Sequence, residues 1–105
     1  MSARRAKFQV GQLVEHRLFD YRGVVYDVDP VFQGTEEWYE TVARTRPPKD
    51  QPWYHVLVHN GIHGTYVAER NLKADDSDEP IVHPATDEFF DGFAGGKYIP
   101  RRTMN

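Results

Sequence analysis

The chain has 105 residues, no cysteine, and 16 acidic against 13 basic side chains, which gives a formal net charge of −3. The length suits one domain with a modest core, and the absence of cysteine excludes disulfides, thiol catalysis and cysteine-type zinc sites. Residues 74 to 96 carry seven acidic and no basic side chains, so an overall basic footprint is absent and any contact with nucleic acid must rest on a local patch.

The first predicted element is a pair of antiparallel strands over Val10 to Asp29. In its second half Val24, Tyr26 and Val28 alternate with other residues, which is the period of a half-buried strand. The link from Phe19 to Gly23 suits a short connection, because Asp20 can bond its own backbone and Gly23 can adopt a positive φ.

A short helix is predicted next, near Glu36 to Ala43. Thr35 is a suitable N-cap, and the acidic residues that follow it favour the positive end of the helix dipole. Trp38 and Val42 lie one turn apart, so the sequence predicts that both face the sheet.

A second antiparallel pair is predicted from Trp53 to His59 and from Thr65 to Ala68. Asn60-Gly61 is a strong turn signal, and Gly64 indicates a connection longer than two residues. A tight turn is expected over Glu69, Arg70 and Asn71. Four or five short strands with one helical insertion predict a mainly β fold, a small curved sheet or barrel.

Beyond this second strand pair the composition changes twice. Ala74 to Glu88 is acidic and interrupted by proline, so we expect irregular surface chain. Phe89 to Ile99 is rich in aromatics and contains too many glycines for a helix. The chain is therefore expected to divide into a flexible basic arm (1–7), the barrel (8–73), and an acidic segment with an aromatic tail (74–105) that docks on the barrel or on a partner.

Several motifs of the chain occur together in one known family. They are HRLFDYRGVVYDVDP, WYETVARTRPPKDQPWYHVLVHNG, YVAERNL, FFDGF and KYIPR. This combination, from about Lys7 to Arg102, closely resembles the heat-shock protein HspQ family, also called the hemimethylated-DNA-binding domain family. The resemblance implies an SH3-like β-barrel of about five antiparallel strands, no catalytic activity, binding of hemimethylated DNA, and promotion of proteolysis by the Lon protease.

For DNA binding, six residues at the first hairpin and in the loop before Trp53 are candidates. They are Arg17, Tyr21, Arg22, Arg44, Arg46 and Lys49. If the two loops lie at one end of the barrel, arginines beside aromatics can contact phosphates or stack on bases. The alternative is a solvated surface in which Arg22 fixes its own turn, and the near-neutral charge of residues 1 to 73 favours this alternative slightly.

For binding to a protein partner, the candidates lie in the C-terminal tail. They are Phe89, Phe90, Phe93, Lys97, Tyr98, Arg101 and Arg102. Such a segment suits capture by a protease or by another copy of the chain, for example in a trimer. The alternative, that the phenylalanines close the bottom of the barrel, is equally compatible with the sequence.

No metal site or cofactor is expected. His55, His59 and His63 are four residues apart, but on a strand His55 and His59 stand about 13 Å apart, too far to share one ion. Ordinary hydrogen-bonded histidines explain the same pattern.

No catalytic site is expected either. Ser2 lies in the basic arm and Ser77 in the acidic segment, where no base is held in fixed geometry. Asp27 and Asp29 share a strand face, but a solvated strand edge explains them better than a paired acid and base. We therefore expect a protein that is not an enzyme.

The favoured functional hypothesis is a cytoplasmic, non-enzymatic heat-shock regulator that acts on Lon-dependent degradation through protein contacts, with hemimethylated-DNA binding as a second activity. The segment from Asp75 to Asp91 would repel a nearby phosphate backbone, which is the reason for placing DNA second. The alternative is a primary DNA-binding module that affects control of replication initiation. No segment has the length of a membrane span, so no membrane partner is expected.

Overall fold

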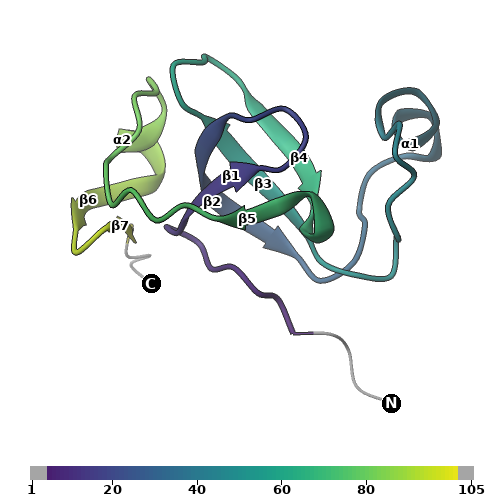
Figure 1. Ribbon diagram of the computed structural model, residues 1–105, viewed down its shortest axis with the longest axis horizontal. Coiled ribbons are helices and arrows are strands. Elements are labelled where there is room, and N and C mark those ends of the chain that lie inside the picture. The colour runs from purple at the N-terminus through teal and green to yellow at the C-terminus, as the bar shows by residue number, and fades with distance from the viewer. Residues whose placement is uncertain (1–4, 102–105) are drawn as a thin grey trace.

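The computed structural model describes residues 5–101, and its main body is a five-stranded antiparallel sheet (Figure 1). The strands are β1 (Leu13–His16), β2 (Arg22–Asp29), β3 (Trp53–Val58), β4 (Gly64–Ala68) and β5 (Leu72–Ala74), in the spatial order β4-β3-β2-β1-β5. The mainly β class is therefore confirmed. Within the described residues β4 and β5 are the edges, so the strand pairing does not close this sheet into a barrel.

Local signals placed two connections correctly. The predicted tight turn is a 3₁₀ helix, Glu69–Asn71, between β4 and β5. The turn after β3 contains Asn60 with a φ of 63° and is longer than two residues, as expected. In the first hairpin, by contrast, the positive φ belongs to Asp20. The prediction for Gly23 is wrong because Gly23 lies inside β2, opposite Val14.

A β-bulge in β2 decides which side chains share a face of the sheet. The register with β3 shifts between Val25 and Asp27, and an extra residue in one strand reverses the facing of those that follow. Val24 and Tyr26 consequently pack in one apolar cluster, whereas Val28 packs in the other, with Val25. The predicted alternation is correct for Val24 and Tyr26 and wrong for Val28.

Both faces of the sheet are covered, so β2 is more deeply buried than the predicted half-buried strand. Val24 and Val25 are neighbours with opposite facing, and each is 0% exposed. One cluster is built from Phe8, Val14, Val25, Tyr54, Val56, Val67 and Leu72, and the other from Leu13, Val24, Leu57, Ile81, Phe90 and Tyr98.

A buried polar contact ties the N-terminal segment to the 3₁₀ helix. The Tyr54 hydroxyl donates to Oε2 of Glu69 at 2.5 Å, and the backbone N–H of Lys7 donates to the same oxygen at 2.8 Å. The N–H of Phe8 donates to the Tyr54 hydroxyl at 3.2 Å. The chain is therefore anchored from residue 7 onward. Residues 1–4 of the predicted flexible arm lie outside the described residues.

Helix α1 (Glu36–Val42) packs over one end of the sheet, near β3 and β4. Thr35 caps it as predicted, since its hydroxyl accepts from the N–H of Trp38 at 3.1 Å. Tyr39 is the residue buried by the helix, and it donates to the carbonyl of Pro47 at 2.7 Å. Trp38 packs against the same cluster, but Val42 is 51% exposed. The predicted facing of Val42 is wrong because the large ring of Tyr39 occupies the apolar contact.

The C-terminal tail forms a second small unit. It consists of helix α2 (Thr86–Phe89) and an antiparallel hairpin of β6 (Phe90–Ala94) and β7 (Lys97–Pro100), on the side of the sheet away from α1 (Figure 1). Gly95 and Gly96 both have positive φ in the hairpin turn, a conformation that glycine adopts without steric cost. The glycines that exclude a long helix therefore serve a hairpin.

This hairpin corrects part of the predicted partner surface. Phe90 and Tyr98 are only 3% and 7% exposed, inside the cluster with Ile81. The Tyr98 hydroxyl donates to the carbonyl of Ile81 and accepts from its N–H, at 3.1 and 3.0 Å. Phe90 and Tyr98 thus close the core and are not presented to a partner in this structure. Phe93 is half-buried against Tyr98.

The remaining tail residues of that set lie at the surface. Phe89, Lys97 and Arg101 are exposed, and Arg101 is 3.6 Å from the carboxylate of Asp91. Arg102 lies outside the described residues. Over residues 5–101 no helix combines the length and apolar character of a membrane span.

Candidate nucleic-acid interface

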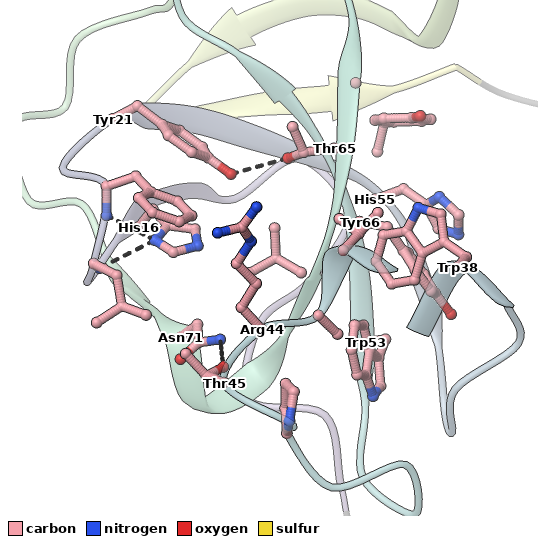
Figure 2. Close-up of a pocket in the computed structure, with 18 residues that line it drawn as sticks. His16, Tyr21, Trp38, Arg44, Thr45, Trp53, His55, Thr65, Tyr66 and Asn71 are labelled. Carbon is pink, nitrogen blue, oxygen red and sulfur yellow. Dashed lines mark hydrogen bonds between the residues drawn. The ribbon is translucent and has the colours of Figure 1, made fainter. Parts of the chain in front are cut away.

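An open groove of about 580 Å³ lies between the β1–β2 turn and helix α1 (Figure 2). Its lining combines residues of the turn, of α1 and the loop that follows, and of strands β3 and β4. They are His16, Leu18, Phe19, Tyr21, Tyr26, Trp38, Val42, Ala43, Arg44, Thr45, Pro47, Trp53, His55, Gly64, Thr65, Tyr66, Val67 and Asn71. Six of these side chains are Trp, Tyr or Phe, so the groove offers broad π surfaces.

The turn that forms one wall is held by a buried histidine. Nδ1 of His16 accepts from the backbone N–H groups of Leu18 and Phe19, at 3.0 and 3.1 Å, and its ring stacks on Phe19 with centroids 4.6 Å apart. Because Nδ1 is an acceptor here, this nitrogen must be unprotonated. Burial also lowers the pKa of His16. The turn is therefore supported by the neutral imidazole, and it leaves Leu18 and Phe19 54% and 72% exposed.

Aromatic rings from three elements form the opposite part of the groove. Trp38 of α1 meets Tyr66 of β4 with centroids 5.6 Å apart and planes at 65°, and His55 of β3 lies 4.5 Å from Tyr66. These three side chains also line an adjoining depression that includes Asp29. The N-cap at Thr35 sets where α1 begins and therefore places Trp38 over the sheet.

A carboxylate fixes the ring of Tyr66. The Tyr66 hydroxyl donates to Oδ2 of Asp29 at 2.6 Å, and Nε2 of His55 lies 3.1 Å from the same oxygen. Burial is the larger cause that raises the pKa of Tyr66, and the hydrogen bond to Asp29 raises it further. The phenol thus stays protonated at physiological pH, and the ring keeps one orientation in the groove.

Of the six predicted DNA-binding residues, Tyr21 and Arg44 line the groove. Arg44 is exposed and extends into the groove, toward the wall that carries His16 and Tyr21 (Figure 2). The Tyr21 hydroxyl is 3.0 Å from Oγ1 of Thr65, which links this wall to β4. The condition that the first hairpin and the loop before Trp53 lie together is met for these two residues.

The other four predicted residues make contacts elsewhere. Arg17 donates to the carbonyl of Leu72 at 3.1 Å, and Arg22 pairs with Asp75 at 2.6 Å. Arg46 pairs with Glu40 at 2.8 Å, and Lys49 pairs with Glu36 at 2.5 Å. None of the four lines the groove. The six therefore do not form one patch. The alternative that Arg22 fixes its own turn is wrong, because its side chain pairs with Asp75 of the acidic segment.

The Arg22 and Asp75 pair is partly buried, with side-chain exposures of 23% and 9%. Burial alone would raise the pKa of Asp75, but hydrogen bonds from Arg22 and Ser77 outweigh it and leave the pKa lowered. This pair attaches the acidic segment to β2 and holds Asp75 in its charged form.

The histidines considered as metal ligands take part in separate hydrogen bonds. Nδ1 of His59 accepts from the N–H of Val82 at 2.8 Å, and the carbonyl of His63 lies 3.1 Å from Nε2 of His83. His55 instead joins Asp27 and Asp29 in a group whose ligand atoms lie within 4.8 Å of one another. Asp29 already accepts from Tyr66 there, so internal hydrogen bonding accounts for this group.

Sequence reasoning missed Trp38, His55 and Tyr66 as groove residues. The sequence placed each of them only on a predicted strand or helix. That their rings meet in one groove depends on how α1 lies against the sheet. The available signal was the number of large aromatics on both sides of the helical insertion, which exceeds what one small core can bury completely.

One comparison with known proteins bears on this groove. A family model described as hemimethylated DNA-binding protein YccV-like matches residues 6–97. The match covers both walls of the groove and the C-terminal hairpin as far as the start of β7.

Proposed function

Since the chain belongs to the YccV-like family of hemimethylated DNA-binding proteins, we propose that it binds hemimethylated duplex DNA at the aromatic groove. The observation that carries this proposal is the position of Arg44, whose side chain extends into the groove among aromatic rings (Figure 2). A guanidinium recognises phosphate through paired hydrogen bonds, and aromatic faces stack on bases. The groove therefore combines the two kinds of contact that a nucleic acid needs.

The position of the acidic segment supports the groove as the DNA site. Among the described residues, no acidic side chain of the segment from Asp75 to Asp91 lines the groove, and Asp75 is neutralised by Arg22. Helices α1 and α2 lie on opposite sides of the sheet (Figure 1). Phe89 of α2 packs on the groove residue Tyr26, but the carboxylates of the segment lie outside the groove lining, so their repulsion weighs less against DNA binding than the sequence implied.

Titration of a labelled duplex tests the proposal. Hemimethylated duplex is expected to bind more tightly than the same unmethylated duplex, and Arg44→Ala is expected to weaken both and lower the salt slope by about 0.9, the value for one phosphate contact. Arg46→Ala is the matched control, because Arg46 pairs with Glu40 outside the groove. Equal binding of both duplexes, or equal effects of the two substitutions, would contradict the proposal.

A second proposal is that the protein promotes Lon-dependent degradation through protein contacts. The HspQ resemblance supports it, and so do the exposed apolar side chains of Ile62 and Val82, which are 72% and 64% exposed. Their segments are joined by the hydrogen bond from Asn60 N–H to the Val82 carbonyl. The test is degradation of a Lon substrate by purified protease with the wild-type protein and with Ile62→Ser/Val82→Ser. An unchanged rate on adding wild-type protein would refute this role.

The finer fold description is also a proposal. We propose that the sheet is of the SH3-like type, which is supported by its five antiparallel strands and by the 3₁₀ helix before β5. Cross-strand amide contacts measured by NMR at the edges β4 and β5 would test closure. We further propose a non-enzymatic, cytoplasmic protein that forms a homo-oligomer such as a trimer, and light scattering on the purified protein would test the oligomeric state.

A further inference from the structure

We infer that the groove takes up a single methylated nucleotide that has been turned out of the duplex. This inference rests on the proposed function and identifies the part of the DNA that the site contacts. It follows from the concave shape of the groove, from the placement of its aromatic rings, and from the opposite charges of Arg44 in the groove and Asp29 in the adjoining depression.

The concave shape of the groove does not suit contact with a methyl group on a base that is still stacked in the duplex. The major groove of DNA admits an α-helix or a two-stranded β-ribbon, but the seven-residue helix α1 packs on the sheet and buries Tyr39. The site is instead a hollow of about 580 Å³, within the size range of small-ligand pockets. A base within the duplex cannot reach the floor of such a hollow, so the nucleotide must leave the stack.

The rings provide the surface on which an extruded base would stack. Trp38 and Tyr66 meet edge to face at 5.6 Å and are both half-buried, so each ring is supported by the protein and still accessible. Phe19, which is 72% exposed, lies on the opposite rim. Burial of one methyl group against these rings favours the methylated base by about fourfold.

The polar groups at the two ends orient the nucleotide. Asp29 lies in the adjoining depression, which shares Trp38, His55 and Tyr66 with the groove. Its Oδ2 accepts from the Tyr66 hydroxyl and is 3.1 Å from Nε2 of His55. A carboxylate has acceptor capacity beyond these contacts, which suits the exocyclic amino group of methylated adenine or cytosine. At the other wall, Arg44 suits the backbone phosphate. A cationic alkylammonium ligand would suit Asp29 and the rings, but Arg44 in the same groove disfavours it.

The test compares labelled duplexes in which the base opposite the methylated position is either paired or replaced by an abasic site. One set carries N6-methyladenine and another 5-methylcytosine, each beside its unmethylated counterpart. Removing the opposing base lowers the cost of extrusion, so wild-type affinity for a methylated duplex is expected to rise on the order of tenfold. Trp38→Ala is expected to lose this gain and the methyl preference, whereas Trp38→Phe retains a ring and should retain most of both.

Ile99→Ala is the control, because Ile99 is an exposed apolar residue that lines neither the groove nor the surface proposed for Lon. This variant should behave like the wild type, and circular dichroism of each variant confirms folding. If methylated duplex is preferred but the abasic site adds no affinity, the extrusion inference is overturned and the proposed function survives. If no methylated duplex is preferred in any arm, the proposed function fails as well. Displacement of DNA by a trimethyl-lysine peptide would also overturn the inference.

Discussion

Phe90→Ala tests whether the C-terminal hairpin belongs to the core. Phe90 is 3% exposed and packs on Tyr98 with ring centroids 5.1 Å apart, on the face of the sheet that also buries Leu13 and Ile81. Truncation of a buried phenylalanine to alanine costs about 3–5 kcal/mol, through lost transfer free energy and the cavity that remains. We expect this substitution to remove much of the total stability, since a small domain has only about 5–15 kcal/mol.

The neighbouring residue supplies the matched control. Phe89 is 37% exposed and meets only the edge of the core through Tyr26, with centroids 4.7 Å apart. Phe89→Ala makes the same chemical change and should cost about 1–2 kcal/mol, because less apolar area is returned to water.

Urea unfolding followed by fluorescence is the assay. Trp53 is 1% exposed and reports on the core, and the difference between the two midpoints gives the difference in the free energy of unfolding when the slope is unchanged. In a thermal scan each kcal/mol corresponds to about 4–8 °C. If Phe90→Ala unfolds at the wild-type midpoint, or if both variants lose the same stability, the hairpin is not part of the core and its aromatics are available to a partner.

Three further predictions follow from buried or paired side chains. The pKa of His16 is lowered by burial, so the unfolded chain binds more protons than the folded chain below about pH 6.5. The contribution of His16 to stability is therefore complete above that pH and is lost as the pH falls. The urea midpoint should fall more between neutral and mildly acidic pH in the wild type than in His16→Gln. Tyr54→Phe should cost about 1–3 kcal/mol because the buried carboxylate of Glu69 loses a donor, and an unchanged melting temperature would refute this. Arg22→Ala should destabilise by about 1–3 kcal/mol, because the carboxylate of Asp75 loses its charged partner and keeps only its hydrogen bonds from Ser77. Asp75→Asn in the same background should recover part of that loss.

Sequence reasoning succeeded where a local rule decides the structure. The cap at Thr35 and the 3₁₀ turn at Glu69–Asn71 depend on residues within a few positions of one another, and both are confirmed. The strand pairs around the first hairpin and after Trp53 also follow from alternation and turn chemistry. Antiparallel neighbours joined by short connections leave few other arrangements.

It failed where packing between distant segments decides. The bulge at Tyr26 has no marker in an alternating strand, so the facing of Val28 could not be predicted. Phe90 and Tyr98 are core residues because the hairpin covers the second face of the sheet, which the sequence could not distinguish from a partner contact. The approach of Trp38 to Tyr66 likewise depends on the path of the loops around α1.

The most direct test of the central claim is NMR mapping of the DNA contact on the labelled protein. On addition of hemimethylated duplex, the largest shifts are predicted for the side-chain indole N–H of Trp38 and for the backbone amides of Phe19, Arg44 and Thr65, all of which line the groove. The backbone amides of Lys97 and Ile99 in β7, which do not line the groove, should move less. Shifts concentrated in α2 and the β6–β7 hairpin, with the groove signals unmoved, would contradict the account.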